Sequence, residues 1–393
     1  MTTPGILSST RSDQKSKILR ERHEAIWAEM RAENYDAIVV AGRGLITQYG
    51  YLEYVTGWCP QVRLAYAVVL PGQEPILIMP TNSDAWFARQ ATGLTDVRAA
   101  GQGDVISEQD SLPQVIADVI TEHRAGSGKI GVVGLRHIVP VGDYEMLKNA
   151  LSQAQITDAT ALVGRVKAIK SMDERAEVVR SAAIADAGME VFAQRAGLGV
   201  AGWELWGDIQ QEVRRRGAQH VLVMVGTGPF FNDPPRSDAL KAGDLASVYV
   251  EITGPNGFWV EKASLFAVGS LSDEKQRLAR ACLASHAAAE AALRAGNTAA
   301  DVAVAVEKVA TPAGVDFGIW HGHGVGVDHD IPVITQTDET VLAEGMVMAL
   351  HPNFVNPTTT VGVSVADTYV VQEGAPQRGS KIPQELRHIE RND

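Results

Sequence analysis

Cysteine is nearly absent from this chain, whose 393 residues include only Cys59 and Cys282. Two cysteines provide no disulfide framework, which is typical of a protein from a reducing compartment. No apolar run approaches the roughly 20 residues of a membrane-spanning helix, and the first residues lack the apolar core of a secretion signal. We therefore expect a cytoplasmic protein that makes no contact with a membrane.

Net positive charge is also lacking, because acidic residues outnumber basic ones and give a formal net charge of −12. This balance argues against binding to nucleic acid or to an anionic membrane surface. The N-terminal part contains no phosphate loop and no G-x-G-x-x-G segment, so nothing supports nucleotide binding. The length, together with 45% hydrophobic residues, predicts two domains.

Residues 1–160 alternate helix-like and strand-like patterns. Helices are predicted at 16–33, 114–122 and 142–153, where apolar residues recur at helical spacing. Short apolar runs typical of buried strands lie at 36–41, 64–70, 75–79 and 129–133. These patterns predict a small α/β domain.

Residues 161–393 predict a second domain of a different kind. Ser171 and Glu174 form a capping-box pattern that opens a long helix reaching about Ala196. Further helices are predicted at 202–217, 272–295 and 298–310, with antiparallel strands between and after them. Helices alternating with antiparallel strands favour an α+β fold whose concave sheet face carries the site.

Four motifs in this second domain carry a family resemblance. They are the hairpin SVYVEITGPNGFWVEKASLF (247–266) and the later segments HGHGVGVDHDIP (321–332), EGMVMALHPNF (344–354) and VGVSVADT (361–368). In order and phrasing they resemble the pita-bread family, which includes methionine aminopeptidase, proline dipeptidase, aminopeptidase P and creatinase. The resemblance is strong over residues 160–375. It implies an α+β pita-bread catalytic domain behind a smaller creatinase-like α/β domain.

The metal ligands of that family are mostly missing. Metal-binding members carry a His in the first late motif and a Glu in each of the other two, where this chain has His323, His351 and Ala366. They also carry two Asp on the hairpin, and counting back from its last Phe places Val250 and Glu261 there. Alanine and valine offer no ligand atom, and an imidazole does not bridge two ions as a carboxylate does. The sequence therefore predicts no metal and no other cofactor.

A single metal ion is the alternative. A mixed set of Glu251, Glu261, His323 and His351 would suit zinc or iron. Glu251 lies one residue from the expected position, so a β-bulge would be needed to turn its carboxylate inward.

The residues left at these positions suit acid–base chemistry. Four of the ten histidines lie within the 31 residues from His321 to His351. His323, His351 and Glu261 are the predicted catalytic groups, because an imidazole beside a partly buried carboxylate shuttles protons near neutral pH. Asp328 is expected to orient an imidazole. The residues predicted to bind substrate are Arg63, Asn232, Asp233, Trp259, His321, His329 and Asp330.

Two of these predictions follow from the resemblance. Asn232 stands where creatinase-like members carry a His that serves as general base, so the base must be another group here. Arg63 precedes a Tyr-Ala-Val run like the creatinase strand whose Arg crosses to the partner's pocket. We therefore expect a homodimer in which the N-terminal domain completes the partner's site and Arg63 binds a substrate carboxylate near the partner's His323.

The leading functional hypothesis is a metal-independent hydrolase that cleaves a C–N bond, amide or amidine-like, in a small polar substrate, as creatinase does. One alternative is a lyase resembling the dimethylsulfoniopropionate lyases of this family, which are acidic at the position of Asp330. A metal-dependent Xaa-Pro peptidase is another. A catalytically silent domain that binds peptides or proteins is the third, and the histidine cluster argues against it.

Overall fold

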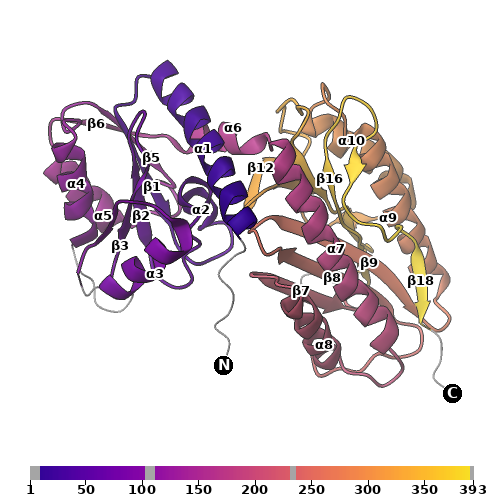
Figure 1. Ribbon diagram of the computed structural model, residues 1–393. Helices are drawn as coiled ribbons and strands as arrows, with labels where there is room; N and C mark the ends of the chain where they lie inside the picture. The colour runs from indigo at the N-terminus through magenta and orange to yellow at the C-terminus, as the bar shows by residue number, and fades with distance from the viewer. Residues whose placement is uncertain (1–8, 102–110, 231–235, 390–393) are drawn as a thin grey trace, which may run out of the picture. The chain divides into compact units, whose positions relative to one another are not determined.

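The chain divides into two compact units, Met1–Lys167 and Ala168–Asp393. The computed structural model describes residues 9–101, 111–230 and 236–389 (Figure 1). The sequence placed the domain boundary after residue 160, whereas most of the connecting helix α6 (Thr160–Ala168) belongs to the first unit. Among the described residues, no helix combines the length and the apolar character needed to cross a membrane.

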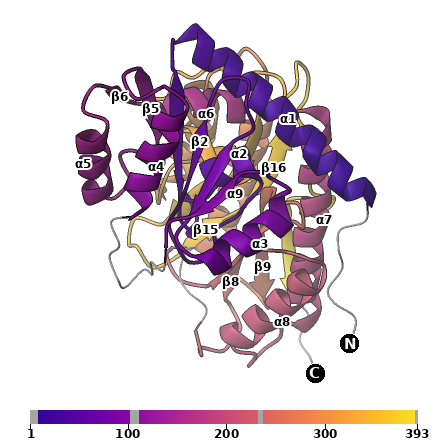
Figure 2. The ribbon, with the colours of Figure 1, turned by 60° about the vertical axis from the view of Figure 1, so that its left-hand side comes forward.

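A six-stranded mixed sheet of order β4-β3-β2-β1-β5-β6 forms the centre of the first unit. Strand β1, one of its two central strands, is buried along its whole length, which explains why its sequence is apolar throughout. The strands are β1 (Ala37–Gly42), β2 (Ala65–Val69), β3 (Ile76–Met79), β4 (Val97–Ala99), β5 (Lys129–Val133) and β6 (Gln155–Asp158). The helices before α6 are α1 (Ser9–Ala32), α2 (Gly50–Thr56), α3 (Asn82–Thr92), α4 (Ser111–Glu122) and α5 (Val141–Ala150). Figure 2 shows α4 lying beside α5.

Helix α3 was not expected from the sequence. Thr81 caps it, since its hydroxyl accepts a hydrogen bond from the backbone N–H of Asp84. Its apolar pattern is misleading because Trp86 and Phe87 are each 57% exposed, whereas the small Ala85 on the same helix is buried. The helix therefore lacks the stripe of large buried residues that marks a helix in sequence.

The second unit contains the predicted long helix α7 (Met172–Arg195) and its capping box. The Ser171 hydroxyl accepts from the backbone N–H of Glu174, whose carboxylate accepts from the backbone N–H of Ser171. Figure 1 shows α7 running across strands β8 (Leu245–Thr253) and β9 (Trp259–Val268), with which it is in contact. The other helices are α8 (Gly202–Arg215), α9 (Asp273–Ala292), α10 (Ala299–Ala310) and the short 3-10 helix Thr311–Ala313.

Three small sheets complete this unit, with orders β18-β9-β8-β7, β12-β11-β13-β16-β17 and β10-β14-β15. Backbone pairing of Ala263 with Ala366 joins the first two. The remaining strands are β7 (Val221–Gly226), β10 (Asp316–Phe317), β11 (Gly322–Val325), β12 (His329–Val333), β13 (Val347–Leu350), β14 (Asn353–Val355), β15 (Gly362–Ser364), β16 (Asp367–Val370), β17 (Gln377–Arg378) and β18 (Leu386–Ile389).

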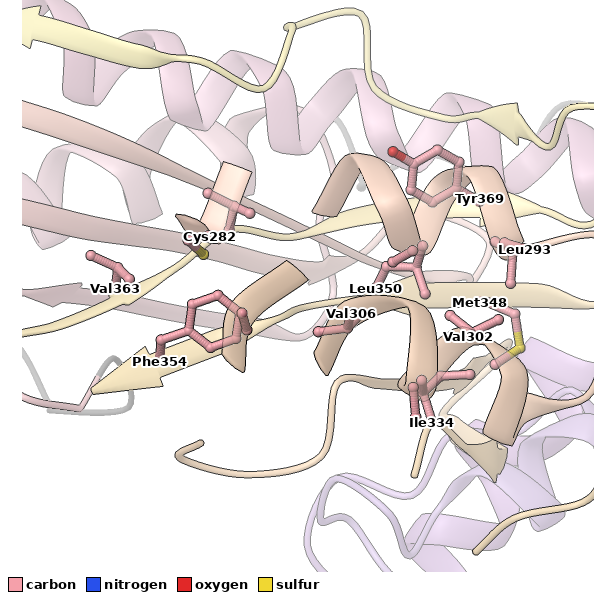
Figure 3. Packing of buried hydrophobic residues seen from close by; sticks show 14 of the residues in the cluster. Cys282, Leu293, Val302, Val306, Ile334, Met348, Leu350, Phe354, Val363 and Tyr369 are labelled. Carbon is pink, nitrogen blue, oxygen red and sulfur yellow. The ribbon is translucent and has the colours of Figure 1, made fainter. Parts of the chain in front are cut away.

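The core of the second unit lies between the sheets and the pair α9 and α10 (Figure 3). Met348 and Leu350 of β13 belong to one buried cluster with Val302 and Val306 of α10. Met346, Met348 and Leu350 thus present apolar side chains to the helices, while the following residue, His351, begins the polar site described below.

A buried ionic network lies around Lys262. Its ammonium donates to the Asp367 carboxylate over 3.0 Å, and both side chains are at most 1% exposed. Arg378 also donates to Asp367, and His286 Nε2 lies 4.0 Å from it. Asp367 on β16 accepts hydrogen bonds from Lys262 on β9, Arg378 on β17 and Gln384 in the segment that follows β17. It therefore links the two joined sheets and that segment.

His286 should make the fold sensitive to mild acid. Burial lowers the pKa of His286 to about 4, so the folded protein keeps this ring neutral while the unfolded chain protonates it below about pH 6.5. The free energy of unfolding should therefore fall by about 2 kcal/mol between pH 7 and pH 5 on account of this group. Urea unfolding of the wild type and of His286→Gln at pH 7 and at pH 5 measures this fall in the free energy of unfolding. An equal loss in the variant would assign the acid sensitivity to other groups.

Candidate active site

Two carboxylates face each other across the hairpin of β8 and β9. Glu251 pairs directly with Glu261 in an unbroken antiparallel register, so both side chains lie on one face of the sheet. The register that placed Val250 inward is wrong, because Val250 lies beside Gly188 of α7 on the other face, and no bulge is needed for Glu251. The turn explains the register, since the two glutamates are equidistant from Asn256 in Gly254–Gly257.

Three histidines surround Glu261. His323 comes from β11, His329 from the start of β12, and His351 directly follows β13. Glu261 Oε1 lies 3.1 Å from His323 Nε2 and 3.5 Å from His329 Nε2. The ring centroids of His323 and His351 are 5.2 Å apart. The structure thus brings the three predicted catalytic residues, His323, His351 and Glu261, into one buried cluster, and adds Glu251 and His329.

Local contacts orient the members of this cluster. His323 Nδ1 donates to the carbonyl of Gly324 over 2.9 Å, because a carbonyl oxygen only accepts. The Thr368 hydroxyl accepts from the backbone N–H of Glu261 over 2.8 Å, which anchors that strand.

His329 is held on both sides. Its Nδ1 lies 3.6 Å from the Asp328 carboxylate, and its Nε2 is 3.9 Å from Glu251. The ring also contacts Trp259, with centroids 4.9 Å apart, so the buried Trp259 side chain lies against the cluster, and its predicted role in substrate binding stays a prediction. With 18% of its side chain exposed, His329 is the cluster member most open to solvent.

Burial and neighbouring charges shift the pKa values of the two carboxylates in opposite directions. Burial, together with the charge of Glu261, raises the pKa of Glu251 well above its usual range. Burial also acts to raise the pKa of Glu261, but the surrounding imidazoles hold it well below its usual range. Burial alone would lower the pKa of His329, yet Asp328 and the two glutamates raise it to about 10. Burial lowers the pKa of His351 to about 4.

An apolar patch occupies the place of the missing fifth ligand. Ala366, which stands where metal-binding relatives carry a Glu, is fully buried in a cluster with Met224, Tyr249 and Ala263. Tyr249 and Ala263 are paired across the hairpin, on the same face as the two glutamates. The face that carries the carboxylates is therefore closed on this side by apolar side chains rather than by a third carboxylate.

Several residues predicted to bind substrate lie elsewhere. His321 precedes β11 and its Nε2 lies 3.3 Å from Glu307 of α10. The Asp330 carboxylate lies 3.5 Å from the buried ammonium of Lys170. Arg63, in the first unit, lies 3.5 Å from Asp84. Asn232 and Asp233 fall outside the described residues.

The donor atoms of the cluster form two sets, each of which could hold a divalent metal ion. One donor atom each of Glu261, His323 and His351 lie within 4.8 Å of one another, and the same holds for Glu251, Glu261 and His329. Both sets share Glu261, and Ala366 contributes no bridging carboxylate. The prediction that the site needs no metal stays a prediction.

Comparison with known proteins identifies the fold and the family. Residues 22–169 match the Creatinase/Prolidase N-terminal domain, and residues 176–373 match Metallopeptidase family M24. The structure superposes on dipeptidase PepE from Mycobacterium ulcerans with a TM-score of 0.79 at 23% identity, covering 95% of this chain and 98% of that one. For an Xaa-Pro dipeptidase from Bacillus anthracis the TM-score is also 0.79, at 20% identity and 94% and 99% coverage. Both matches show the two-domain pita-bread fold.

Relatives found by sequence comparison support the same family assignment. A putative dipeptidase, YkvY, of Bacillus subtilis is 24% identical over 82% of this chain and 89% of its own length. The Xaa-Pro dipeptidase of Pyrococcus furiosus is 24% identical over 72% of this chain and 83% of its own length. The chain therefore belongs to metallopeptidase family M24. It is an enzyme of the hydrolase class.

Proposed function

We propose that this enzyme hydrolyses a C–N bond, of amide or amidine type, in a small polar substrate, with Glu261 as general base and Glu251 as general acid. The observation that carries the proposal is the placement of two buried carboxylates opposite each other, with His329 close to both. Their pKa values are displaced in opposite directions, which is the pattern of a paired base and acid.

The proton transfers follow from this arrangement. Glu261, kept ionised by the imidazoles around it, takes a proton from the attacking water, whose oxygen forms a bond to the substrate carbon. The C–N bond then breaks, and Glu251 gives its proton to the departing nitrogen. His329, fixed by Asp328, stabilises the negative charge that moves from one glutamate to the other. Proton exchange with solvent on the exposed side of His329 then returns Glu261 to its ionised form and Glu251 to its protonated form.

A divalent ion on Glu261, His323 and His351, when bound, would polarise the bond under attack as a Lewis acid. Glu251 and His329, which lie outside that set, would keep the roles given above, and His323 is oriented for either state by its bond to the Gly324 carbonyl. Buried Trp259 excludes water from one side of the cluster.

The choice of substrates to test comes from the relatives. Proteins named dipeptidase and Xaa-Pro dipeptidase support an amide bond, whereas the creatinase resemblance supports an amidine-like bond in a small carboxylate. Dipeptides with and without C-terminal proline, and guanidino carboxylates such as creatine, form the first panel. Release of an amine or of urea, without an unsaturated product, separates hydrolysis from the elimination alternative.

The acid role of Glu251 is testable through the leaving group. Glu251→Gln should lower kcat on an alkyl amide by about 100-fold or more, because glutamine gives no proton to the departing amine. On the matching p-nitroanilide the loss should be less than about tenfold, since 4-nitroaniline departs with little help. Glu307→Gln is the matched control, because Glu307 pairs with His321 outside the cluster. Equal losses on both substrates would remove the acid role from Glu251.

We also propose the homodimer in which Arg63 binds a substrate carboxylate near the partner's His323. The proposal is supported by the position of Arg63 in the N-terminal sequence pattern and by its guanidinium, which already faces a carboxylate, that of Asp84. A substrate carboxylate would take the place of Asp84 in that interaction.

A further inference from the structure

A pocket in the first unit is formed by the segment 58–63, the end of β3 and helix α3. Its volume of about 480 Å³ lies within the roughly 300–1,000 Å³ that is usual for small-molecule sites. The glutamates and histidines of the proposed reaction all belong to the second unit. The proton transfers described above therefore do not explain what this pocket binds.

Most of the pocket wall is apolar. Trp58, Met79 and Phe87 line it together with Val62. Phe87 and Val62 are both more than half exposed, although each is a large apolar side chain. Exposed apolar side chains that gather at one concave place typically mark a binding site. The wall therefore favours a ligand with an apolar body.

One ion pair provides the charged part of the pocket. Both carboxylate oxygens of Asp84 lie 3.5 Å from the same atom, Nη1 of Arg63, and both side chains are partly exposed. The Thr81 hydroxyl donates to Asp84 over 2.7 Å, which holds that carboxylate in place. A guanidinium pairs best with a carboxylate through two short parallel bonds, and a single nitrogen at 3.5 Å falls short of that geometry. A ligand that brings a carboxylate to Arg63 and a cation to Asp84 would improve on this contact.

We propose that this pocket binds a free α-amino acid with a large apolar side chain. Arg63 pairs with its carboxylate and Asp84 with its ammonium. Its side chain lies among Trp58, Met79 and Phe87. An α-amino acid carries its two opposite charges on groups bonded to one carbon atom, which matches the two opposite charges 3.5 Å apart in the pocket. A ligand with a carboxylate alone would meet the charge of Asp84, and one with an ammonium alone would meet that of Arg63.

Such a site would make the enzyme sensitive to its own product, a consequence that rests on the proposed function, whereas the binding itself does not. Hydrolysis of a dipeptide breaks its C–N bond and releases two free amino acids. The proposed homodimer uses Arg63 for the substrate carboxylate, so an amino acid bound there would compete with the substrate. L-Phenylalanine should then raise KM and leave kcat unchanged. An unchanged KM at concentrations that fill the pocket would count against the homodimer, and the binding assignment would stand.

Calorimetry on the purified full-length protein measures the binding without any turnover. We expect one equivalent of L-phenylalanine or L-leucine per chain, and at least about tenfold weaker binding of glycine, which has no apolar side chain to bury. 3-Phenylpropionate lacks the ammonium and phenethylamine lacks the carboxylate, so each should bind at least about tenfold more weakly than L-phenylalanine. No binding of L-phenylalanine at millimolar concentrations, or equal affinity for 3-phenylpropionate, would overturn the proposal.

Variants locate the site. Arg63→Met and Phe87→Ala should each weaken L-phenylalanine binding by about tenfold or more, because the first removes the carboxylate contact and the second removes part of the apolar wall. Trp86→Ala is the matched control, since Trp86 is as exposed as Phe87 but only Phe87 of the two lines the pocket. Glu261→Gln should bind L-phenylalanine as the wild type does. Circular dichroism melts confirm folding, and Asp84→Asn replaces any variant that fails to fold. Loss of binding in Trp86→Ala or Glu261→Gln equal to that in Arg63→Met would contradict the assignment.

Discussion

Replacing Glu261 with glutamine should lower kcat by about 100-fold to 10,000-fold on every substrate that the enzyme turns over. Glutamine keeps the shape of the side chain but takes no proton from water. The loss should be the same for an alkyl amide and for its p-nitroanilide, since attack by water precedes departure of either amine. Steady-state kinetics on both substrates, with Glu307→Gln as control, measures the effect.

The pattern across the two glutamates is more informative than either loss alone. Glu261 lies among three imidazoles, whereas Glu251 is close to one. If Glu261→Gln showed the leaving-group dependence expected of Glu251→Gln, the two roles would be exchanged. If Glu261→Gln kept the turnover of the wild type, the acid–base proposal would fail altogether.

Replacing Asp367 with asparagine should lower the free energy of unfolding by about 3–5 kcal/mol. Asp367 is fully buried and accepts from Lys262, Arg378 and Gln384. The asparagine leaves the Lys262 ammonium buried without an opposite charge, which is worse than having no ion pair at all. Chemical denaturation at pH 7 measures the change.

A matched exposed pair provides the control for Asp367. Asp84→Asn removes the carboxylate that lies 3.5 Å from Arg63, and both side chains of that pair are partly exposed. Its removal should change the free energy of unfolding by at most about 1 kcal/mol. Similar effects of the two substitutions would mean that water solvates the Lys262 ammonium or that a rearranged carboxylate pairs with it.

The elements that local chemistry determines were predictable. The Ser171 capping box predicted α7, and the apolar run 36–41 predicted β1. Both patterns depend only on residues that are neighbours along the chain. Helix α3 escaped prediction because Trp86 and Phe87 point outward and hide its pattern.

Part of the cluster was predictable as residues, but the register of Glu251 was not. The late motifs led to His323 and His351, which the structure brings to Glu261. The predicted register was wrong by one residue and placed Val250 where Glu251 lies, because the count started from the end of the hairpin. A count from the turn pairs the two glutamates directly. The contact of His321 with Glu307 depends on packing against α10, which no local pattern encodes.

The apolar patch beside the two glutamates also restricts which side chains position 366 can accept. A glutamate introduced at position 366 would have to enter a fully buried space shared with Met224, Tyr249 and Ala263, where burying its charge among largely apolar side chains would be unfavourable. One substitution at position 366 is therefore expected to destabilise the fold rather than to supply a usable ligand. A carboxylate at this position would need compensating substitutions among Met224, Tyr249 and Ala263.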